Sequence, residues 1–104
     1  MIESGKKSVA VDEDGVVVSV KPGLYAAKAM SVYNSGSSYL YAKANSTAAL
    51  AKAAVAAGEG FIPIAPMGSF HWDRLGAIEN VALVCAGGES TTADVMAVSR
   101  SDNE

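Results

Sequence analysis

The stretch Val9–Val20, with the sequence VAVDEDGVVVSV, decides the fold class. Valines recur at alternate positions for much of this stretch, which is the period of a half-buried β-strand. Asp14-Gly15 between these runs is a strong turn signal, because glycine accepts the positive φ that tight hairpin turns require. The stretch therefore predicts two strands, Lys6–Asp12 and Val16–Val20, joined as a hairpin.

The rest of the chain continues as short apolar runs between turn residues. Extended patterns are expected over Leu24–Tyr33, Tyr39–Asn45, Ser69–Arg74, Val81–Ala86 and Thr91–Ser99, with turns at Lys21-Pro22-Gly23, Met67-Gly68 and Gly87-Gly88. Phe61–Pro66 is apolar but carries two prolines, which suits an edge strand or an extended connection. Seven or eight such strands indicate a small antiparallel β-sandwich or barrel of the jelly-roll type.

One segment departs from the β pattern. Ser46 is a candidate N-cap for a short helix over Thr47–Ala57, and Gly58 is its stop signal. A helix of this length is marginal alone, so it must dock on the sheet to persist. We therefore expect one mainly β domain over residues 1–104, with flexible tails at 1–5 and 100–104.

Composition excludes several classes of function. A net charge of −3 argues against a nucleic-acid partner, because phosphate binding needs clustered Lys and Arg. Cys85 is the only cysteine, which excludes an internal disulfide and a disulfide-stapled secreted scaffold. No segment reaches the roughly 18 to 20 apolar residues of a membrane span, and residues 1–7 lack the apolar core of a signal peptide. We expect synthesis in a cytoplasm and no membrane partner.

Candidate reactive residues are few. His71 is the only histidine, and a metal site would need three or four ligands, with Cys85 the only soft one elsewhere. Cysteine nucleophiles occupy exposed, electropositive settings, whereas Cys85 lies in the apolar run Val81–Ala86 and should be a buried thiol. Asp12-Glu13-Asp14-Gly15 lacks the further ligands of a calcium loop. We predict no catalytic residue, no metal site and no cofactor.

The composition also indicates self-association. Charged residues make up 18% of the chain, against roughly 25% in an average soluble domain, and hydrophobic residues make up 50%. Alanine accounts for part of this excess, and surface covered in an assembly is the other explanation. Aromatic residues are enriched at interface centres. The candidate interface residues are aromatic: Tyr39, Tyr41, Phe61, Phe70 and Trp72.

Several features carry a resemblance to a known class of proteins. They are the step Val32-Tyr33-Asn34-Ser35-Gly36, the run Tyr39-Leu40-Tyr41, the segment Pro63 to Phe70 (similar to P-[IL]-x-P-G-x-S-[FY]), and two closing apolar strands, Val81–Ala86 and Asp94–Val98, split by a Gly-rich turn. This layout, from Val32 to Val98, resembles small tailed-phage virion proteins of the capsid decoration and head or neck accessory type. The alanine-rich Thr47–Ala57 and the long N-terminal hairpin depart from it.

The resemblance implies a non-enzymatic virion structural protein that is present in many copies. Such a protein is expected to be a homo-oligomer that binds other virion proteins such as the major capsid protein, and to reside in the virion after synthesis in the host cytoplasm. Two alternatives stay open. One is a carbohydrate- or receptor-binding β module with exposed Trp72, Tyr39 and Tyr41, and the other is a small enzyme using Cys85 and His71.

Overall fold

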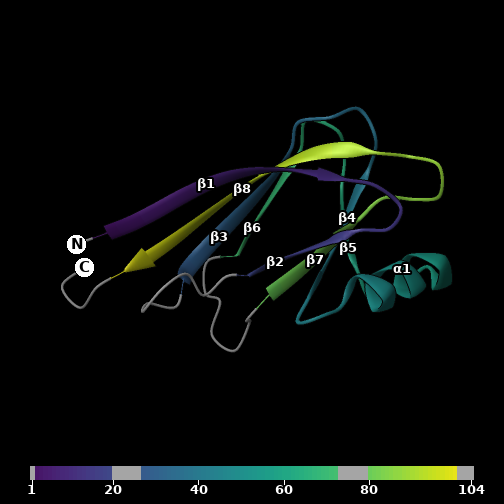
Figure 1. Cartoon of the computed structure of the whole chain (residues 1–104), viewed down its shortest axis with the longest axis horizontal. Helices are drawn as coiled ribbons and strands as arrows, with labels where there is room; N and C mark the ends of the chain where they lie inside the picture. Colours follow the sequence, from purple (N-terminus) through teal and green to yellow (C-terminus); the bar gives the residue numbers. More distant parts are fainter. Residues whose placement is uncertain (1, 20–26, 73–79, 101–104) are drawn as a thin grey trace.

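The computed structural model describes residues 2–19, 27–72 and 80–100. Within these ranges the elements are β1 (Ile2–Val11), β2 (Val16–Ser19), β3 (Ala27–Asn34), β4 (Leu40–Ala44), α1 (Ala48–Ala57), β5 (Ile62–Ile64), β6 (Ser69–Trp72), β7 (Asn80–Val84) and β8 (Thr91–Arg100). They form two antiparallel sheets: sheet A, in the order β1-β8-β3-β6, and sheet B, in the order β2-β7-β4-β5 (Figure 1). The predicted mainly β fold with one helix is confirmed.

The two sheets enclose one apolar core. Where side chains are described, alternate strand residues face inward, as the period of two requires. The buried members of the core come from both sheets: Val9, Val11, Met30, Val32, Leu40, Ala42, Ile64, Val81, Leu83, Cys85, Ala93 and Val95. Burying one valine or leucine side chain is worth roughly 1.5–3 kcal/mol, so this double layer of alternating residues holds the sheets together.

The turn at Gly15 is where the sequence predicts it, but the predicted hairpin is wrong. Gly15 has a φ of 81°, and its N–H donates to the carbonyl oxygen of Asp12 at 3.2 Å. However, β1 pairs with β8 in sheet A, whereas β2 pairs with β7 in sheet B. The chain therefore crosses from one sheet to the other at this turn. Val9 and Val11 are buried and Val16 and Val18 are partly buried against the same core, because the two sheets face that core from opposite sides.

The helix is confirmed, with its cap displaced by one residue. Thr47 is the N-cap, and its side-chain oxygen accepts from the N–H of Leu50 at 3.2 Å. The predicted cap, Ser46, is buried, and its hydroxyl donates to the carbonyl oxygen of Thr47 at 2.9 Å. Gly58 ends the helix in the left-handed conformation, as predicted.

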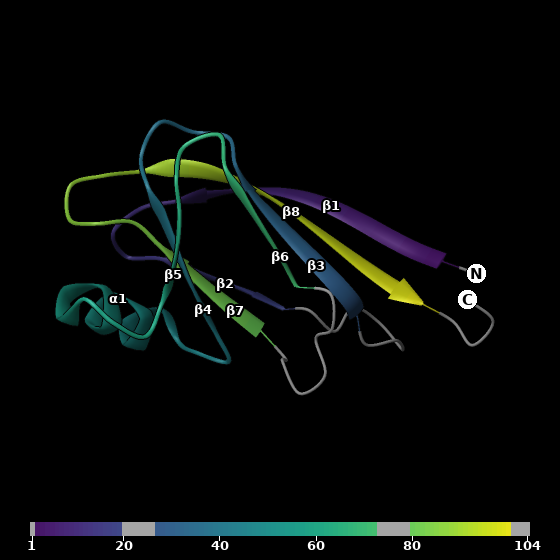
Figure 2. The ribbon, with the colours of Figure 1, turned by 180° about the vertical axis from the view of Figure 1, so that it is seen from behind.

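Helix α1 docks on the outer face of sheet B, as its short length demands. Ala51 is buried against Ala82 and Val84 of β7, and Val55 and Tyr41 pack around this contact. The side chains at the centre are small, so the helix approaches the sheet closely. Figure 2 shows α1 beside sheet B, on the side away from sheet A.

Other elements predicted from the sequence are present where the structure describes them. β5 is an edge strand of sheet B with Pro63 opposite Tyr41, as the two prolines indicated. The turns at Met67-Gly68 and Gly87-Gly88 are present. The expected turn Lys21-Pro22-Gly23 and the expected ends at Leu24 and Arg74 lie outside the described residues.

Residues 2–5 and Arg100, which were expected to belong to flexible tails, lie in strands. β1 begins at Ile2 and β8 ends at Arg100, and these two residues are paired. Each strand supplies the backbone partner of the other, so pairing persists through the polar ends of both. Residues 1 and 101–104 lie outside the described ranges. Figures 1 and 2 show β1 and β8 running side by side to the end of the molecule farthest from α1.

Candidate functional site

Three of the five candidate interface residues lie together on the outer face of sheet B. Tyr39 and Tyr41 flank Leu40, and their rings are stacked with centroids 6.2 Å apart and planes 22° apart. Phe61, just before β5, meets Tyr41 edge to face at 5.1 Å. Tyr39 is 47% exposed and ends the row. We call Tyr39, Tyr41 and Phe61 the aromatic cluster.

The aromatic cluster rests on a rigid base. Tyr41 packs against the contact between α1 and β7, which holds the buried side chains of Ala51, Ala82 and Val84. On the other side, Lys43 donates from Nζ to the carbonyl oxygen of Gly60 at 3.1 Å, which ties β4 to the segment that carries Phe61. Aromatic pairs of this geometry add about 0.5–1.5 kcal/mol beyond their buried area. The rings are therefore held in place without a bound partner.

Phe70 and Trp72 lie elsewhere. Both are on β6 of sheet A, and both pack against the main core with their ring centroids 4.6 Å apart. They alternate with His71, so the period of the strand turns them inward and His71 outward. The structure therefore separates them from the aromatic cluster, and we take neither as part of that surface.

The structure also separates Cys85 from His71. Cys85 is 2% exposed, faces the core, and its thiol donates to the carbonyl oxygen of Val11 at 3.5 Å. Burial raises the pKa of this thiol to about 11, and the charges of Glu89 and Asp12 add to the effect. His71 lies on the outer face of sheet A, where its Nδ1 contacts the hydroxyl of Ser31. Because sheet A stands between them, the two cannot form a nucleophile–base pair, and the prediction of a buried thiol is confirmed.

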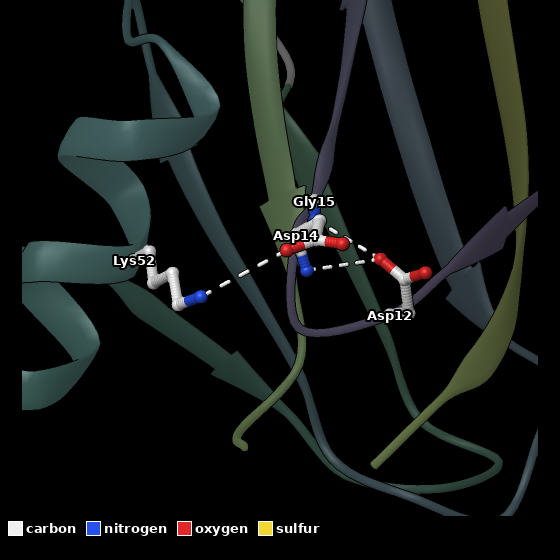
Figure 3. A network of polar contacts seen from close by, with 4 residues as sticks. All are labelled: Asp12, Asp14, Gly15 and Lys52. Carbon is white, nitrogen blue, oxygen red and sulfur yellow. Dashed lines mark hydrogen bonds and ion pairs between the residues drawn. The ribbon is translucent and has the colours of Figure 1, made fainter. Parts of the chain in front are cut away.

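The acidic turn has a structural role. The Oδ1 atom of Asp12 accepts from the N–H groups of Asp14 and Gly15, at 2.9 and 3.3 Å (Figure 3). The carboxylate of Asp14 faces the ammonium of Lys52 on α1 at 3.9 Å. Both ends of this pair are well exposed, so it contributes little energy. The turn thus lies beside the helix.

Two further properties of residues 2–19, 27–72 and 80–100 concern metal binding and membrane crossing. Within these ranges, no three side chains of His, Cys, Asp or Glu come together in a way that could hold a metal ion. The same part of the chain contains no helix that is long and apolar enough to cross a membrane.

A buried asparagine organises the end of the sandwich where β3 stops. Asn34 is fully buried, and its Nδ2 donates to the carbonyl oxygens of Ser38 and Ile64 at 2.7 and 3.0 Å. Its Oδ1 accepts from the N–H of Gly36 at 3.2 Å and from the hydroxyl of Thr91 at 2.6 Å. The amide therefore uses all four of its hydrogen-bonding positions. The Asn-x-Gly step is visible in the sequence, but the buried role of Asn34 is not, because Ile64 and Thr91 lie far along the chain.

The backbone of Asn34 extends this network to the turn before β6. Its N–H donates to the carbonyl oxygen of Gly68 at 2.9 Å, and its own carbonyl oxygen accepts from the N–H of Met67 at 2.8 Å. Met67 has a φ of 65° and is 69% exposed, and the hydroxyl of Tyr33 donates to its sulfur at 3.4 Å. The buried amide thus fixes three chain segments without offering a group to a ligand.

Comparison with known proteins identifies the fold. No protein-family profile and no curated protein matches this sequence. The cupin domain of Schizosaccharomyces pombe Cnp3 is similar, with a TM-score of 0.55 at 12% identity over 93% of this chain and 53% of that chain. A de novo designed double-stranded β-helix matches with a TM-score of 0.54 at 12% identity, over 91% of this chain and 97% of that one. The chain thus spans about half of the Cnp3 structure and nearly all of the designed one.

A third similar structure comes from Bacillus endospore appendages, which form a novel family of disulfide-linked pili. It matches with a TM-score of 0.55 at 13% identity over 97% of this chain and 89% of that chain. At such identities the likeness shows the fold alone, which is a mainly β fold of the cupin or double-stranded β-helix kind. The resemblance to tailed-phage proteins has no matching sequence family.

Proposed function

We propose that this chain is a non-enzymatic structural subunit of a larger assembly, of the capsid decoration or head or neck accessory type, present in many copies on a virion. The observation that carries the proposal is the aromatic cluster. Tyr39 is half exposed at the end of a supported row of rings. Large rigid aromatic side chains on a fixed base are typical of interface centres, because they lose little entropy on binding.

The packing between the two sheets supports the proposal that partners bind to the outer surfaces of the molecule. The space between the sheets is filled by apolar side chains from both sheets. The buried polar residues of the described part are Asn34, Ser46 and Thr91, and each makes hydrogen bonds within the protein. A core packed in this way holds the sheets in register and leaves recognition to the outer surfaces.

The partners we propose are further copies of this chain and other virion structural proteins, with the major capsid protein first among them. The chain is acidic and has few charged residues. We therefore expect the interface to consist of aromatic and backbone contacts more than of ion pairs. The likeness to an appendage subunit supports the proposal only in that a fold of this kind occurs in a repeating assembly.

The test is binding to virion proteins by two matched variants. Tyr39→Ala removes the exposed ring of the aromatic cluster, and Met96→Ala removes a side chain of nearly equal exposure, 46%, on sheet A. Candidate capsid and tail proteins are immobilised, and the binding of each variant is measured. We expect Tyr39→Ala to weaken binding about tenfold or more, which corresponds to about 1.4 kcal/mol, and Met96→Ala to leave it unchanged.

Other outcomes of this experiment contradict the proposal. Equal losses in both variants would mean that the aromatic cluster is not the contact. A chain that ignores virion proteins but binds on a glycan array, with Tyr39→Ala abolishing that binding, would establish the carbohydrate-binding alternative. Trp72 belongs to the core, so a sugar platform would have to consist of Tyr39 and Tyr41.

A further inference from the structure

A small pocket lies between helix α1 and the segment that follows β7. Its volume is about 290 Å³, which is at the small end of the range for ligand pockets, about 300–1,000 Å³. The lining residues are Lys52, Val55 and Ala56 on α1, and Cys85, Ala86 and Gly87 after β7. Apart from Lys52, these residues offer apolar or very small side chains, so the walls suit the hydrocarbon part of a ligand.

Both walls of this pocket are fixed parts of the fold. Helix α1 is held on sheet B by Ala51, which is buried against β7. On the other wall, the N–H of Cys85 donates to the carbonyl oxygen of Asp12 at 3.0 Å. The N–H of Glu89 donates to the carbonyl oxygen of Ala86, also at 3.0 Å, and closes the turn after β7. The walls are therefore held in place by contacts within the protein.

The charges around the pocket are mostly negative. A side-chain carbon at Gly87 would lie 3.6 Å from Oε2 of Glu13, so this carboxylate borders the pocket, and Glu89 belongs to the turn that forms the same wall. The ammonium of Lys52 faces the carboxylate of Asp14 at 3.9 Å (Figure 3). The cation in the lining is thus matched by one carboxylate, and the charges of Glu13 and Glu89 remain.

The thiol of Cys85 experiences the same negative surroundings. Burial is the main cause that raises its pKa to about 11, and the charges of Glu89 and then Asp12 raise it further. Surroundings that disfavour a thiolate favour a positive charge at the same place. The electrostatics of the pocket therefore agree with the positions of the carboxylates around it.

We propose that this pocket binds a small primary alkylamine in its protonated form. The hydrocarbon chain lies between Val55, Ala56 and Ala86, and the ammonium group stays at the opening, near Glu13 and Glu89, where it keeps part of its water. A carboxylate of the same size would meet like charges there, and an alcohol would gain no ion pair. The rings of the aromatic cluster do not line the pocket, so this site goes beyond the proposed function and is independent of it.

The first test compares three ligands of similar size and different charge. n-Butylammonium chloride, n-butanol and sodium butyrate are titrated into isotope-labelled protein at a fixed low ionic strength, and the backbone amide signals are followed by NMR. Butylammonium should bind with a Kd on the order of 1–20 mM and shift the signals of Val55, Ala56, Ala86 and Gly87 most. Butanol should bind about fivefold or more weakly, and butyrate most weakly.

Two results of these titrations would contradict the proposal. Equal Kd values for the three ligands would show that the carboxylates do not select the ligand. Failure of butylammonium to saturate at about 100 mM, or shifts spread over the whole surface, would show that there is no such site.

Filling the pocket is the second test. Ala56→Leu adds a side chain that occupies the pocket, whereas Ala57→Leu adds the same side chain at the next helical residue, which is not among the lining residues. Leucine favours a helix, so both variants should fold, and circular dichroism checks this. Ala56→Leu should weaken butylammonium binding about tenfold and Ala57→Leu should leave it unchanged. Equal binding by the two variants would overturn the location of the site.

Charge variants test the role of the carboxylates without changing the shape of the pocket. Glu13→Gln should weaken butylammonium binding about threefold and leave butanol binding unchanged. Asp94→Asn is the matched control, because it removes the same charge on sheet A, where Asp94 accepts from the hydroxyl of Ser8 at 2.6 Å. Lys52→Met removes the cation from the lining and should tighten binding. Weaker binding by Lys52→Met, or equal losses in Glu13→Gln and Asp94→Asn, would contradict the assigned charges.

A peptide distinguishes a free amine from a lysine side chain, which carries the same aminobutyl group. The peptide acetyl-Gly-Lys-Gly-amide should bind no more tightly than butylammonium. A peptide that binds about tenfold more tightly would overturn the free amine as the ligand and assign the pocket to a partner protein. Neither Glu13 nor Ala56 belongs to the aromatic cluster, so these variants should bind virion proteins like the unaltered chain, and the Tyr39→Ala variant should bind butylammonium like the unaltered chain.

Discussion

Replacing Asn34 with alanine should be one of the most damaging single changes in the chain. The substitution removes four hydrogen bonds and leaves four former partners behind: the carbonyl oxygens of Ser38 and Ile64, the N–H of Gly36 and the hydroxyl of Thr91. Ile64 is 2% exposed and Thr91 is 7% exposed, so water does not readily replace the lost partner at either.

The magnitude follows from these burials. An orphaned buried polar group costs about 1–3 kcal/mol, so the two best-buried groups account for about 2–6 kcal/mol, whereas the more open Ser38 and Gly36 regain water. Adding the space left by the amide gives about 3–7 kcal/mol. The free energy of unfolding of a small domain is about 5–15 kcal/mol, so Asn34→Ala should remove a large part of it.

Urea unfolding followed by circular dichroism measures the effect. With an m-value of about 1–3 kcal/mol per molar urea, the midpoint should fall by about 1 M or more. Ser35→Ala is the matched control: its hydroxyl donates to the carbonyl oxygen of Thr92 at 3.1 Å, but the N–H of Ser35 also donates there at 2.9 Å, so no acceptor is orphaned. The control should lose less than about 0.5 kcal/mol. A loss below about 1 kcal/mol in Asn34→Ala would refute the reasoning.

Four further predictions concern packing and the buried thiol. Gly36→Ala should cost at least about 2 kcal/mol in urea unfolding, because its Cβ would overlap the hydroxyl oxygen of Thr91, whereas a Cβ at Gly87 has its nearest neighbour at 3.6 Å, so Gly87→Ala should be nearly silent. Val84→Asp buries an unpaired charge and should prevent soluble expression or cost several kcal/mol, while Asp14→Asn in the exposed turn should be nearly silent; equal melting temperatures would contradict this. Cys85 should react slowly with thiol reagents at neutral pH, because burial raises its pKa from 9.0 to about 11. The unfolded chain releases this proton first, so stability should fall as the pH rises from 9.0 to about 11, and Cys85→Ala should flatten that fall; an equal slope in both proteins would contradict it.

Strand positions were predictable from the sequence, and strand partners were not. Alternation over Val9–Val20 located β2, the second half of β1 and the turn at Gly15 correctly, because these signals are local, whereas the first residues of β1 were expected to be a tail. The same alternation fits a hairpin and a crossing between sheets equally well, since both bury the same valines. What distinguishes them is the pairing with β8 and β7, whose residues lie far along the chain.

For the candidate site, too, local features were predictable from the sequence and long-range contacts were not. Tyr39 and Tyr41 were predictable as neighbours on one face, because they alternate around Leu40. Phe70 and Trp72 share a face for the same reason, but only the sheet order shows that their face is the core. The role of Asn34 depends on partners 30 and 57 positions away, which no local pattern contains.

The pairing of β1 with β8 has a consequence for how the chain acquires its structure. The paired residues are 80 positions apart at Val11 and Thr91, and 98 apart at Ile2 and Arg100. Contacts of such long sequence separation slow folding, because the entropy of closing the loop is lost before the contact forms. During synthesis β1 precedes β8, so β1 waits for the residues between them before its partner exists. Until then both of its edges are open, so the nascent chain passes through a period in which premature association competes with folding.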